Sequence, residues 1–297
     1  MSRLNYIQQE IIKVLTYFDY FRFPLSLDEI HRFIGVLIEK EELKRETDRL
    51  LSSGEIFCFE DCFLLINDPE RVERKLIGKK MANKRMKRAK VIASLIMSFP
   101  FVRMVSISGS LSKGYADKST DIDFFIVTTE NQLWTARTFL HLLKKVSFLF
   151  RLEHSFCMNY FLSESHLEIE EQNYFTAVEL ATLIPNKGKG IHSQLIDKNK
   201  WLSHHLPNVK IEYVPQKTLG PKYLKWLFEA LLKSKKLNDF LMKFTDKRWR
   251  KKWAKKGFDP NEYDLAFKTD KTVSKNHPSN YQKKILDHIE NNKIQNN

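Results

Sequence analysis

The stretch from Ile107 to Val127 constrains this chain most, because it sets a Gly-Ser pair and two aspartates between apolar runs. Gly109 and Ser110 follow a short apolar segment, and Asp121 and Asp123 begin a second one. Short apolar runs bounded by turn residues predict buried strands. We therefore expect two strands, at 102–107 and 122–127, joined by a loop or short helix.

The residue types in this stretch predict a site for a metal ion and a triphosphate. Side chains alternate along a strand, so Asp121 and Asp123 point to the same side. Paired carboxylates suit a hard divalent cation such as Mg²⁺ or Mn²⁺. A Gly-Ser turn before a helix offers free N–H groups and a hydroxyl to phosphate oxygens. We expect Asp121 and Asp123 to be catalytic and metal-binding, and Gly109, Ser110 and Lys113 to bind the NTP.

These residues resemble the signature of the DNA polymerase β-like nucleotidyltransferase superfamily, in which a hydrophobic strand and Gly-Ser precede Asp-x-Asp by about ten residues. The similarity to poorly characterised bacterial members covers roughly residues 95–205. It includes Phe99–Val102, Leu133–Arg137, Phe156–Leu162, Tyr174–Glu179 and Asn199–Trp201. The resemblance implies a mixed sheet with helices. It also implies transfer of a nucleoside monophosphate from an NTP to an acceptor hydroxyl, with release of pyrophosphate.

Active members of this superfamily generally carry a third carboxylate on a later strand. The sequence of this chain does not show which residue would supply it. The predicted strand at 155–162 offers Asn159, on the face expected for Cys157 and Phe161. An amide oxygen can bind a metal ion, but it cannot act as a base at neutral pH. We add Asn159 as a metal ligand. The nearest acids are Glu153, Glu164 and Glu179, of which we keep Glu179 as a weaker addition. Two alternatives remain: an active enzyme and a catalytically inactive nucleotide-binding regulator.

Residues 1–68 predict a separate module of three helices and a hairpin. Apolar residues recur at helical spacing from Ile7 to Phe18, and Ser26 with Glu29 forms a capping box for a second helix. A third helix over 39–53 and a hairpin over 56–66 follow, in an order that resembles a winged helix-turn-helix. A winged-helix nucleic-acid-binding protein is therefore a third functional alternative. The mixed charge of the third helix and the acidic turn favour protein–protein or intramolecular packing instead.

Two segments carry most of the basic charge. Residues 70–90, within a predicted linker helix over 69–98, hold ten Lys or Arg and two Glu, and residues 217–257 hold fourteen Lys or Arg and three acids, in a chain of net charge +14. Trp249 and Trp253 lie between cations in the second segment. It is compatible with a nucleic acid or another anionic acceptor, with a helical cap on the catalytic domain, and with an anionic membrane surface.

The remaining features predict a cytoplasmic protein of several parts. No run of about 18 apolar residues occurs, and the first residues do not resemble a signal peptide. Cys58, Cys62 and Cys157 are interpreted as structural or incidental in a reducing compartment. We expect an α+β chain divided into a winged-helix-like module (1–68), a linker helix (69–98), a nucleotidyltransferase domain (99–210) and a basic helical C-terminal region (211–297). The sequence indicates neither the oligomeric state, nor the base, nor the acceptor.

Overall fold

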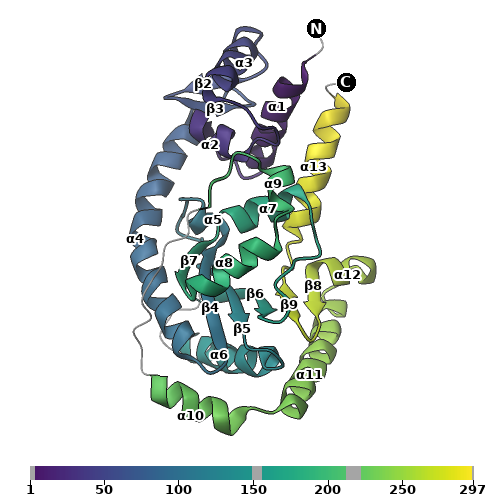
Figure 1. The fold of residues 1–297 in the computed structure, drawn as a ribbon. Coiled ribbons are helices and arrows are strands. Elements are labelled where there is room, and N and C mark those ends of the chain that lie inside the picture. Colours follow the sequence, from purple (N-terminus) through teal and green to yellow (C-terminus); the bar gives the residue numbers. More distant parts are fainter. Residues whose placement is uncertain (1–3, 149–155, 212–221, 296–297) are drawn as a thin grey trace.

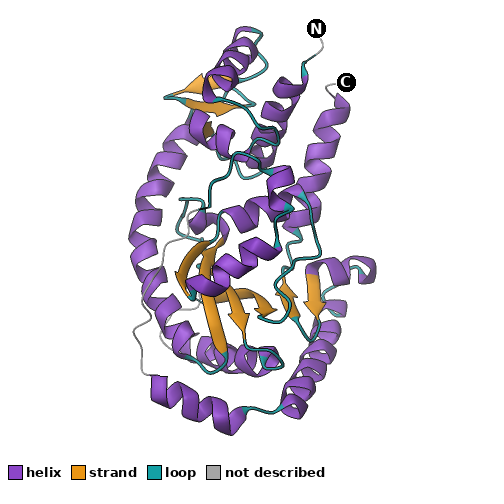
Figure 2. Cartoon of the chain, viewed as in Figure 1, coloured by secondary structure: helices purple, strands orange, loops and turns teal. Residues whose placement is uncertain are grey.

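The computed structural model describes residues 4–148, 156–211 and 222–295 and shows an α+β architecture (Figures 1 and 2). Its N-terminal part contains the three predicted helices and the hairpin, together with a two-residue strand that completes a small sheet of order β1-β3-β2. The elements are α1 (Tyr6–Asp19), β1 (Leu25–Ser26), α2 (Leu27–Phe33), α3 (Lys40–Ser52), β2 (Phe57–Phe59) and β3 (Cys62–Leu64). DNA binding by this part stays a prediction.

A six-stranded mixed sheet forms the centre of the molecule. Its strands, in spatial order, are β7 (Ile184–Lys187), β4 (Val102–Ser108), β5 (Asp123–Thr128), β6 (Cys157–Ser163), β9 (Val273–Asn276) and β8 (Phe267–Thr269). The β5–β6 pair is parallel, and the other neighbours are antiparallel. The two strands predicted around the Gly-Ser and Asp-x-Asp motifs are thus direct neighbours. Because they are antiparallel, the end of β4 and the start of β5 lie side by side, and so do the two motifs.

Helices surround this sheet. They are α4 (Glu70–Ser98), α5 (Gly109–Ser112), α6 (Leu133–Phe148), α7 (Tyr174–Ala181), α8 (Lys189–Lys198), α9 (Leu202–His205), α10 (Lys222–Leu232), α11 (Lys235–Ala254), α12 (Pro260–Ala266) and α13 (Tyr281–Gln295). The long helix α4 runs from the N-terminal part to the far end of the sheet (Figure 1). None of the helices within 4–148, 156–211 and 222–295 has the length and apolarity needed to cross a membrane.

The two faces of β5 contribute to two different cores, as expected for a strand that is buried on both sides. Phe124 and Ile126 pack in a cluster with residues of α4 and α6. Phe125 and Val127 belong to the other cluster, which extends through α7 into the N-terminal helices. The N-terminal part therefore shares a hydrophobic core with one face of the central sheet.

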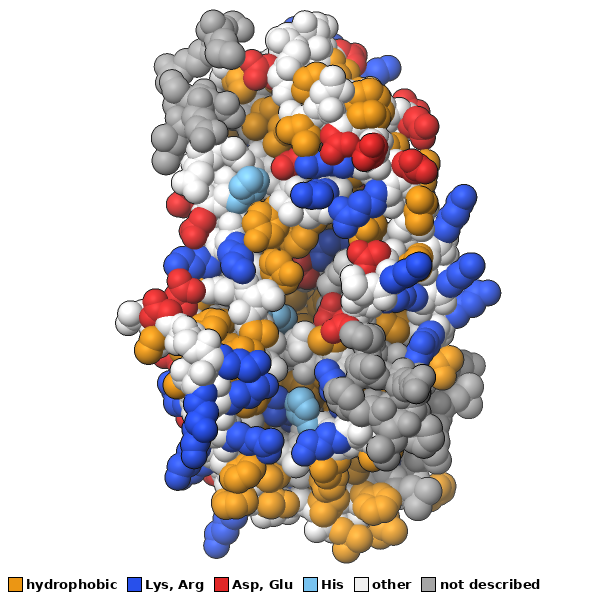
Figure 3. Space-filling view, turned by 180° about the vertical axis from the view of Figure 1, so that it is seen from behind, with side chains coloured by type: hydrophobic (Ala, Val, Ile, Leu, Met, Phe, Trp, Pro, Cys, Tyr) orange, Lys and Arg blue, Asp and Glu red, His pale blue; other side chains and the backbone are white. Residues whose placement is uncertain are grey.

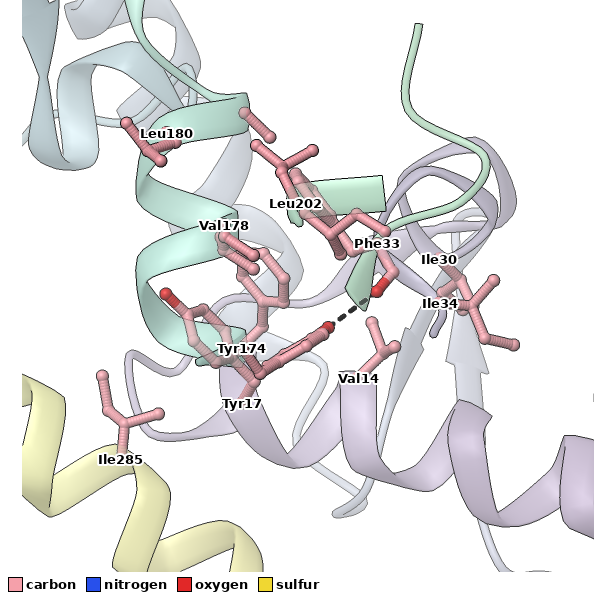
Figure 4. Packing of buried hydrophobic residues seen from close by; sticks show 14 of the residues in the cluster. Val14, Tyr17, Ile30, Phe33, Ile34, Tyr174, Val178, Leu180, Leu202 and Ile285 are labelled. Carbon is pink, nitrogen blue, oxygen red and sulfur yellow. Dashed lines mark hydrogen bonds between the residues drawn. The ribbon is translucent and has the colours of Figure 1, made fainter. Parts of the chain in front are cut away.

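Tyrosines join the N-terminal part to α7 (Figure 4). The Tyr174 hydroxyl donates a hydrogen bond of 2.7 Å to the Phe33 carbonyl oxygen. The ring of Tyr17 meets that of Tyr174 edge-on, with 5.5 Å between their centroids. Arg32 also donates to the Ala181 carbonyl oxygen at 3.0 Å. These contacts make α7 and α1–α2 one packed unit, which positions the wall of the cavity described below.

The C-terminal region differs from the helical prediction, because residues 267–276 form β8 and β9. Strand β9 pairs with β6, and Tyr160 lies opposite Lys275. Lys275 is buried, and its Nζ contacts carboxyl and amide oxygens of Glu171 and Gln282 at 3.3 and 3.1 Å. A polar tail thus becomes part of the sheet through long-range pairing that its own composition does not indicate. Of the second basic segment, residues 217–221 lie outside the described residues.

Candidate active site

Gly109 lets the backbone approach the Asp123 carboxylate closely, at the end of strand β4. Strand β4 ends at Ser108, which is the ladder partner of Asp123 at the start of β5. Gly109 has φ +68°, and a Cβ placed on it would lie 2.3 Å from Oδ2 of Asp123. Only glycine accepts both this left-handed conformation and this close approach. The backbone of the Gly-Ser turn is therefore held directly beside the Asp123 carboxylate.

The Asp123 carboxyl group lies in a negative and poorly solvated environment. Its withdrawal from water raises its pKa to about 6, and the charges of Asp121 and Glu179 act in the same direction. The charge of Lys113 and a hydrogen bond with Cys157 oppose the increase. The surroundings thus penalise the ionised carboxylate in the absence of a cation. A bound divalent ion would remove that penalty.

Lys113 and Glu179 complete the polar end of the site. The Lys113 ammonium group contacts a Glu179 carboxylate oxygen at 2.7 Å and the Gly109 carbonyl oxygen at 3.3 Å. Lys113 follows α5, whereas Glu179 lies on α7, so this ion pair connects the Gly-Ser turn to the opposite wall. The structure therefore places Glu179, which the sequence suggested only weakly, beside the predicted site.

Asn159 also lies at this site, but its nitrogen faces the carboxylate. The Nδ2 group of Asn159 donates to Asp123 Oδ1 at 3.3 Å and lies 2.9 Å from the sulfur of Cys157. In this orientation Asn159 stabilises the ionised aspartate. Its carbonyl oxygen would have to turn toward Asp123 before the side chain could bind a metal ion.

The face predicted for β6 is wrong beyond this residue. In the β5–β6 ladder Phe124 pairs with Met158 and Phe125 with Tyr160, so Asn159 is an extra residue in a β-bulge. The bulge shifts the alternation by one, and Phe161 consequently packs in the core on the opposite side of the sheet. Strict alternation along the strand predicted Phe161 on the cavity side. Tyr160 lies there instead.

A cavity of about 460 Å³ opens beside these groups. Gly109, Ser110, Asp121 and Asp123 line its polar end. The rings of Phe125 and Tyr160, which also line the cavity, are stacked with their centroids 4.9 Å apart. Such a cavity, with an apolar wall and a few convergent polar groups, is typical of a small-molecule site.

Several lining residues were not predicted from the sequence. They include Phe125, Tyr160, Lys275 and His277. Burial lowers the pKa of His277 to about 4, so this ring is neutral at physiological pH. The alternation of β5 could have pointed to Phe125, which lies two residues after Asp123. Lys275 and His277 reach the cavity only because β9 joins the sheet.

Asp121 and Asp123 could together bind a divalent metal ion. Within 4–148, 156–211 and 222–295, no group of three or more His, Cys, Asp or Glu residues has the arrangement of a metal site. Mg²⁺ needs fewer, because it commonly binds one or two carboxylates and takes its other ligands from water and substrate phosphates. Asp121 and Asp123 supply such a pair at the cavity wall, and withdrawal from water, which raises the pKa of Asp123, makes its ionised form one that a bound cation would stabilise. The residues therefore fit the ion.

Glu164, another acid near the predicted β6, lies at the opposite end of the sheet. Glu164 follows Ser163, which pairs with Thr128 at the end of β5 opposite to Asp123. Glu153 lies outside the described residues. Of the two described acids, Glu164 and Glu179, it is Glu179 that lines the cavity.

The comparisons with known proteins add no relative to this picture. No protein-family model matches the chain, and neither the search of curated proteins nor that of solved structures found a match.

Proposed function

We propose that this chain is a metal-dependent nucleotidyltransferase, which transfers a nucleoside monophosphate from an NTP to a hydroxyl group of an acceptor. The observation that carries the proposal is the contact between the Gly109 backbone and the Asp123 carboxylate at one end of the cavity. This contact sets a phosphate-binding turn beside a cation-binding carboxylate. A metal–triphosphate complex needs both within reach of one another.

Each polar group then has a role in the reaction. Backbone N–H groups and the Ser110 hydroxyl hold the β- and γ-phosphates, and Lys113 adds positive charge. Asp121 and Asp123 hold Mg²⁺ or Mn²⁺, which when bound neutralises the triphosphate and polarises the α-phosphate. The acceptor oxygen forms a bond to the α-phosphorus while the bond to the bridging α,β oxygen breaks, and pyrophosphate leaves.

Glu179 is the proton acceptor in this proposal. In the structure its carboxylate is held by Lys113 at 2.7 Å. A bound triphosphate competes for the same ammonium group, so its arrival releases Glu179 as a free carboxylate near the reacting hydroxyl. The proton of the acceptor then passes to Glu179 as the new P–O bond forms.

The orientation of Asn159 favours a second candidate, a nucleotide-binding protein without catalysis. The Asn159 amide donates to Asp123 at 3.3 Å. Active members of the superfamily that this chain resembles generally carry a carboxylate on the corresponding later strand. If Glu179 remains paired with Lys113 after the nucleotide binds, no base is available. The protein would then bind metal and NTP and transfer nothing.

Label transfer separates these candidates. The purified chain is incubated with α-phosphate-labelled NTPs, Mg²⁺ or Mn²⁺, and cellular RNA, protein and small molecules as acceptors. We expect labelled product with the wild-type chain, its loss in Asp121→Asn/Asp123→Asn and in Glu179→Gln, and unchanged labelling in the control Asp287→Asn, whose side chain is exposed on α13. Metal-dependent NTP binding without label in any acceptor would support the non-catalytic candidate. If the chain neither binds NTP nor transfers label, both candidates are contradicted.

A further inference from the structure

Helix α10 turns Lys225 and Glu229 toward the protein. The Lys225 ammonium group donates to the carbonyl oxygens of Met97 and Val102 at 2.9 and 2.6 Å. Glu229 accepts two hydrogen bonds from the Arg103 guanidinium, at 2.7 and 3.0 Å, and a third from the Phe101 amide at 2.7 Å. These contacts fix the orientation of α10 about its own axis.

The opposite face of α10 is apolar and faces solvent. Tyr223 is 89% exposed, Trp226 68% and Leu231 73%. Residues spaced by three and four lie on one side of a helix, and Leu227 continues this exposed stripe. In an ordinary surface helix the apolar stripe faces the core and the charges face water. The polarity of α10 is the reverse of this.

Helix α11 extends the same surface. Leu237, Phe240 and Phe244 are exposed on it, and the two phenylalanine rings are stacked with their centroids 6.3 Å apart. The other side of α11 holds it to the body, where buried Asn238 accepts from the Trp134 amide at 2.8 Å. We call the combined surface the apolar end face. It comprises Tyr223, Trp226, Leu227, Phe228, Leu231, Leu237, Phe240 and Phe244.

Positive charge borders the apolar end face. Residues 222–256 contain thirteen Lys or Arg and three acids. Of these acids, Glu229 is paired with Arg103, and Asp246 lies 3.1 Å from Arg250. Lys233, Lys235 and Lys236 are exposed where α10 meets α11. Figure 3 shows hydrophobic side chains gathered along this end of the molecule, with Lys and Arg side chains beside them.

Trp249 and Trp253, which would stack on bases under the nucleic-acid alternative, pack against other residues of the chain. The ring of Trp253 is stacked on Phe267 at 4.8 Å, and the Arg137 guanidinium lies 4.4 Å from the ring centroid of Trp249. Both indoles thus pack within the chain. The exposed rings of Tyr223, Trp226, Phe228, Phe240 and Phe244 belong to the apolar end face.

Self-association through this face is disfavoured by its charged border. A symmetric dimer apposes the same patch of two copies. It would therefore bring Lys233, Lys235 and Lys236 of one copy close to those of the other. A bilayer with negatively charged headgroups has the complementary arrangement, with an apolar interior below a layer of anionic phosphates.

We propose that the apolar end face attaches this protein peripherally to an anionic lipid bilayer. Trp226, Tyr223 and Phe240 enter the boundary between headgroups and acyl chains, where aromatic side chains are favoured. The lysines at the α10–α11 junction bind the lipid phosphates. The attachment needs both terms, because a few aromatic side chains or a few lysines alone bind a membrane weakly and reversibly.

Vesicle co-sedimentation tests the proposal with the full chain. Vesicles of equal parts phosphatidylcholine and phosphatidylglycerol are compared with vesicles of phosphatidylcholine alone. We expect binding to the anionic vesicles, at least about tenfold weaker binding to the neutral ones, and weakening with added salt. Trp226→Ser/Phe240→Ser is expected to lower the partition coefficient by about tenfold or more.

Matched variants identify the surface involved. Val91→Ser/Leu95→Ser removes exposed apolar side chains from α4 instead, and should leave the partition coefficient unchanged. Lys233→Gln/Lys235→Gln/Lys236→Gln should weaken binding, whereas Lys79→Gln/Lys80→Gln/Lys84→Gln, also exposed on α4, should have a smaller effect. Equal circular dichroism and melting temperatures establish that all four variants are folded.

Three outcomes would overturn the proposal. The first is equal partitioning of the wild-type chain and Trp226→Ser/Phe240→Ser on anionic vesicles. The second is a dimer in analytical ultracentrifugation that Trp226→Ser/Phe240→Ser dissociates, which would assign the face to self-association. The third is salt-dependent RNA binding that this variant abolishes while vesicle binding persists, which would assign it to a nucleic acid.

Discussion

The cavity and the apolar end face depart from the usual distribution of side chains in opposite directions. At the cavity, the Asp123 carboxyl is withdrawn from water and has a pKa raised to about 6. At the end face, Trp226 is 68% exposed. A poorly solvated carboxylate is stabilised by a cation, and an exposed indole is stabilised by an apolar partner. Under the two proposals above, each region takes a ligand of the chemistry it lacks, which is a cation at the cavity and an apolar surface at the end face.

The largest expected effect concerns the cavity. Asp121→Asn/Asp123→Asn removes both carboxylates of the proposed metal site and should lower the rate of nucleotidyl transfer by about a thousandfold or more. Rates of label incorporation measure this. An equal loss in the control Asp287→Asn would show that the effect is not specific to the site.

The second prediction concerns the free energy of unfolding without metal. Because the folded pKa of Asp123 is raised, its protonated form is favoured on folding, and stability falls as pH rises from about 4 through about 6. Asp123→Asn removes this penalty. It should stabilise the metal-free protein by at most about 3 kcal/mol at pH 8, and by close to nothing at pH 4.

Urea unfolding at the two pH values, with EDTA present, measures that difference. Added Mg²⁺ should then stabilise the wild-type chain and have little effect on Asp123→Asn. A variant less stable than the wild type at pH 8 would contradict the description of Asp123 as an uncompensated carboxylate.

The third prediction compares two glycines with the same backbone conformation. Gly109 and Gly114 have φ +68° and +76°, but a Cβ on Gly114 would meet nothing within 4 Å. Gly114→Ala should therefore cost only backbone strain, about 1 kcal/mol, whereas Gly109→Ala should cost about 2 kcal/mol more because it also displaces Asp123. Unfolding free energies and nucleotide affinities measured on both variants check this, and equal losses in both quantities would contradict it.

The smallest effect is expected at the apolar end face. Trp226→Ser removes a side chain that is already exposed, so the unfolding free energy should change by less than about 0.5 kcal/mol. Thermal and urea unfolding measure the change. A loss of about 2 kcal/mol or more would mean that the indole contributes to the folded core, and the end face would then need no ligand.

The polar end of the cavity was largely predictable because its signals are local. The turn at Gly109, the strand that begins at Asp123 and the helix over 70–98 each follow from patterns within a few residues. The resemblance, which implies a third metal ligand on a later strand, pointed to Asn159, and the structure brings its side chain within 3.3 Å of Asp123.

Other features depend on contacts between distant segments and were not predictable. The bulge at Asn159 turns Tyr160 toward the cavity and Phe161 toward the opposite side of the sheet. No local sequence pattern predicts this bulge. Strand β9 forms by pairing with β6, which lies far away in the sequence, and its Lys275 contacts Glu171. Helix α10 lies in the region predicted to be helical, yet its apolar stripe faces outward, and Lys225 and Glu229 have their partners inside.

The central claim is that Gly109, Asp121 and Asp123 form a metal–triphosphate site, and isothermal titration calorimetry of ATP and GTP tests it most directly. We predict NTP binding in Mg²⁺ that is lost in EDTA, lost in Asp121→Asn/Asp123→Asn, and retained in Gly114→Ala. NTP binding of equal affinity in the wild-type chain and in Asp121→Asn/Asp123→Asn, or no binding of any NTP in Mg²⁺ or Mn²⁺, would contradict it.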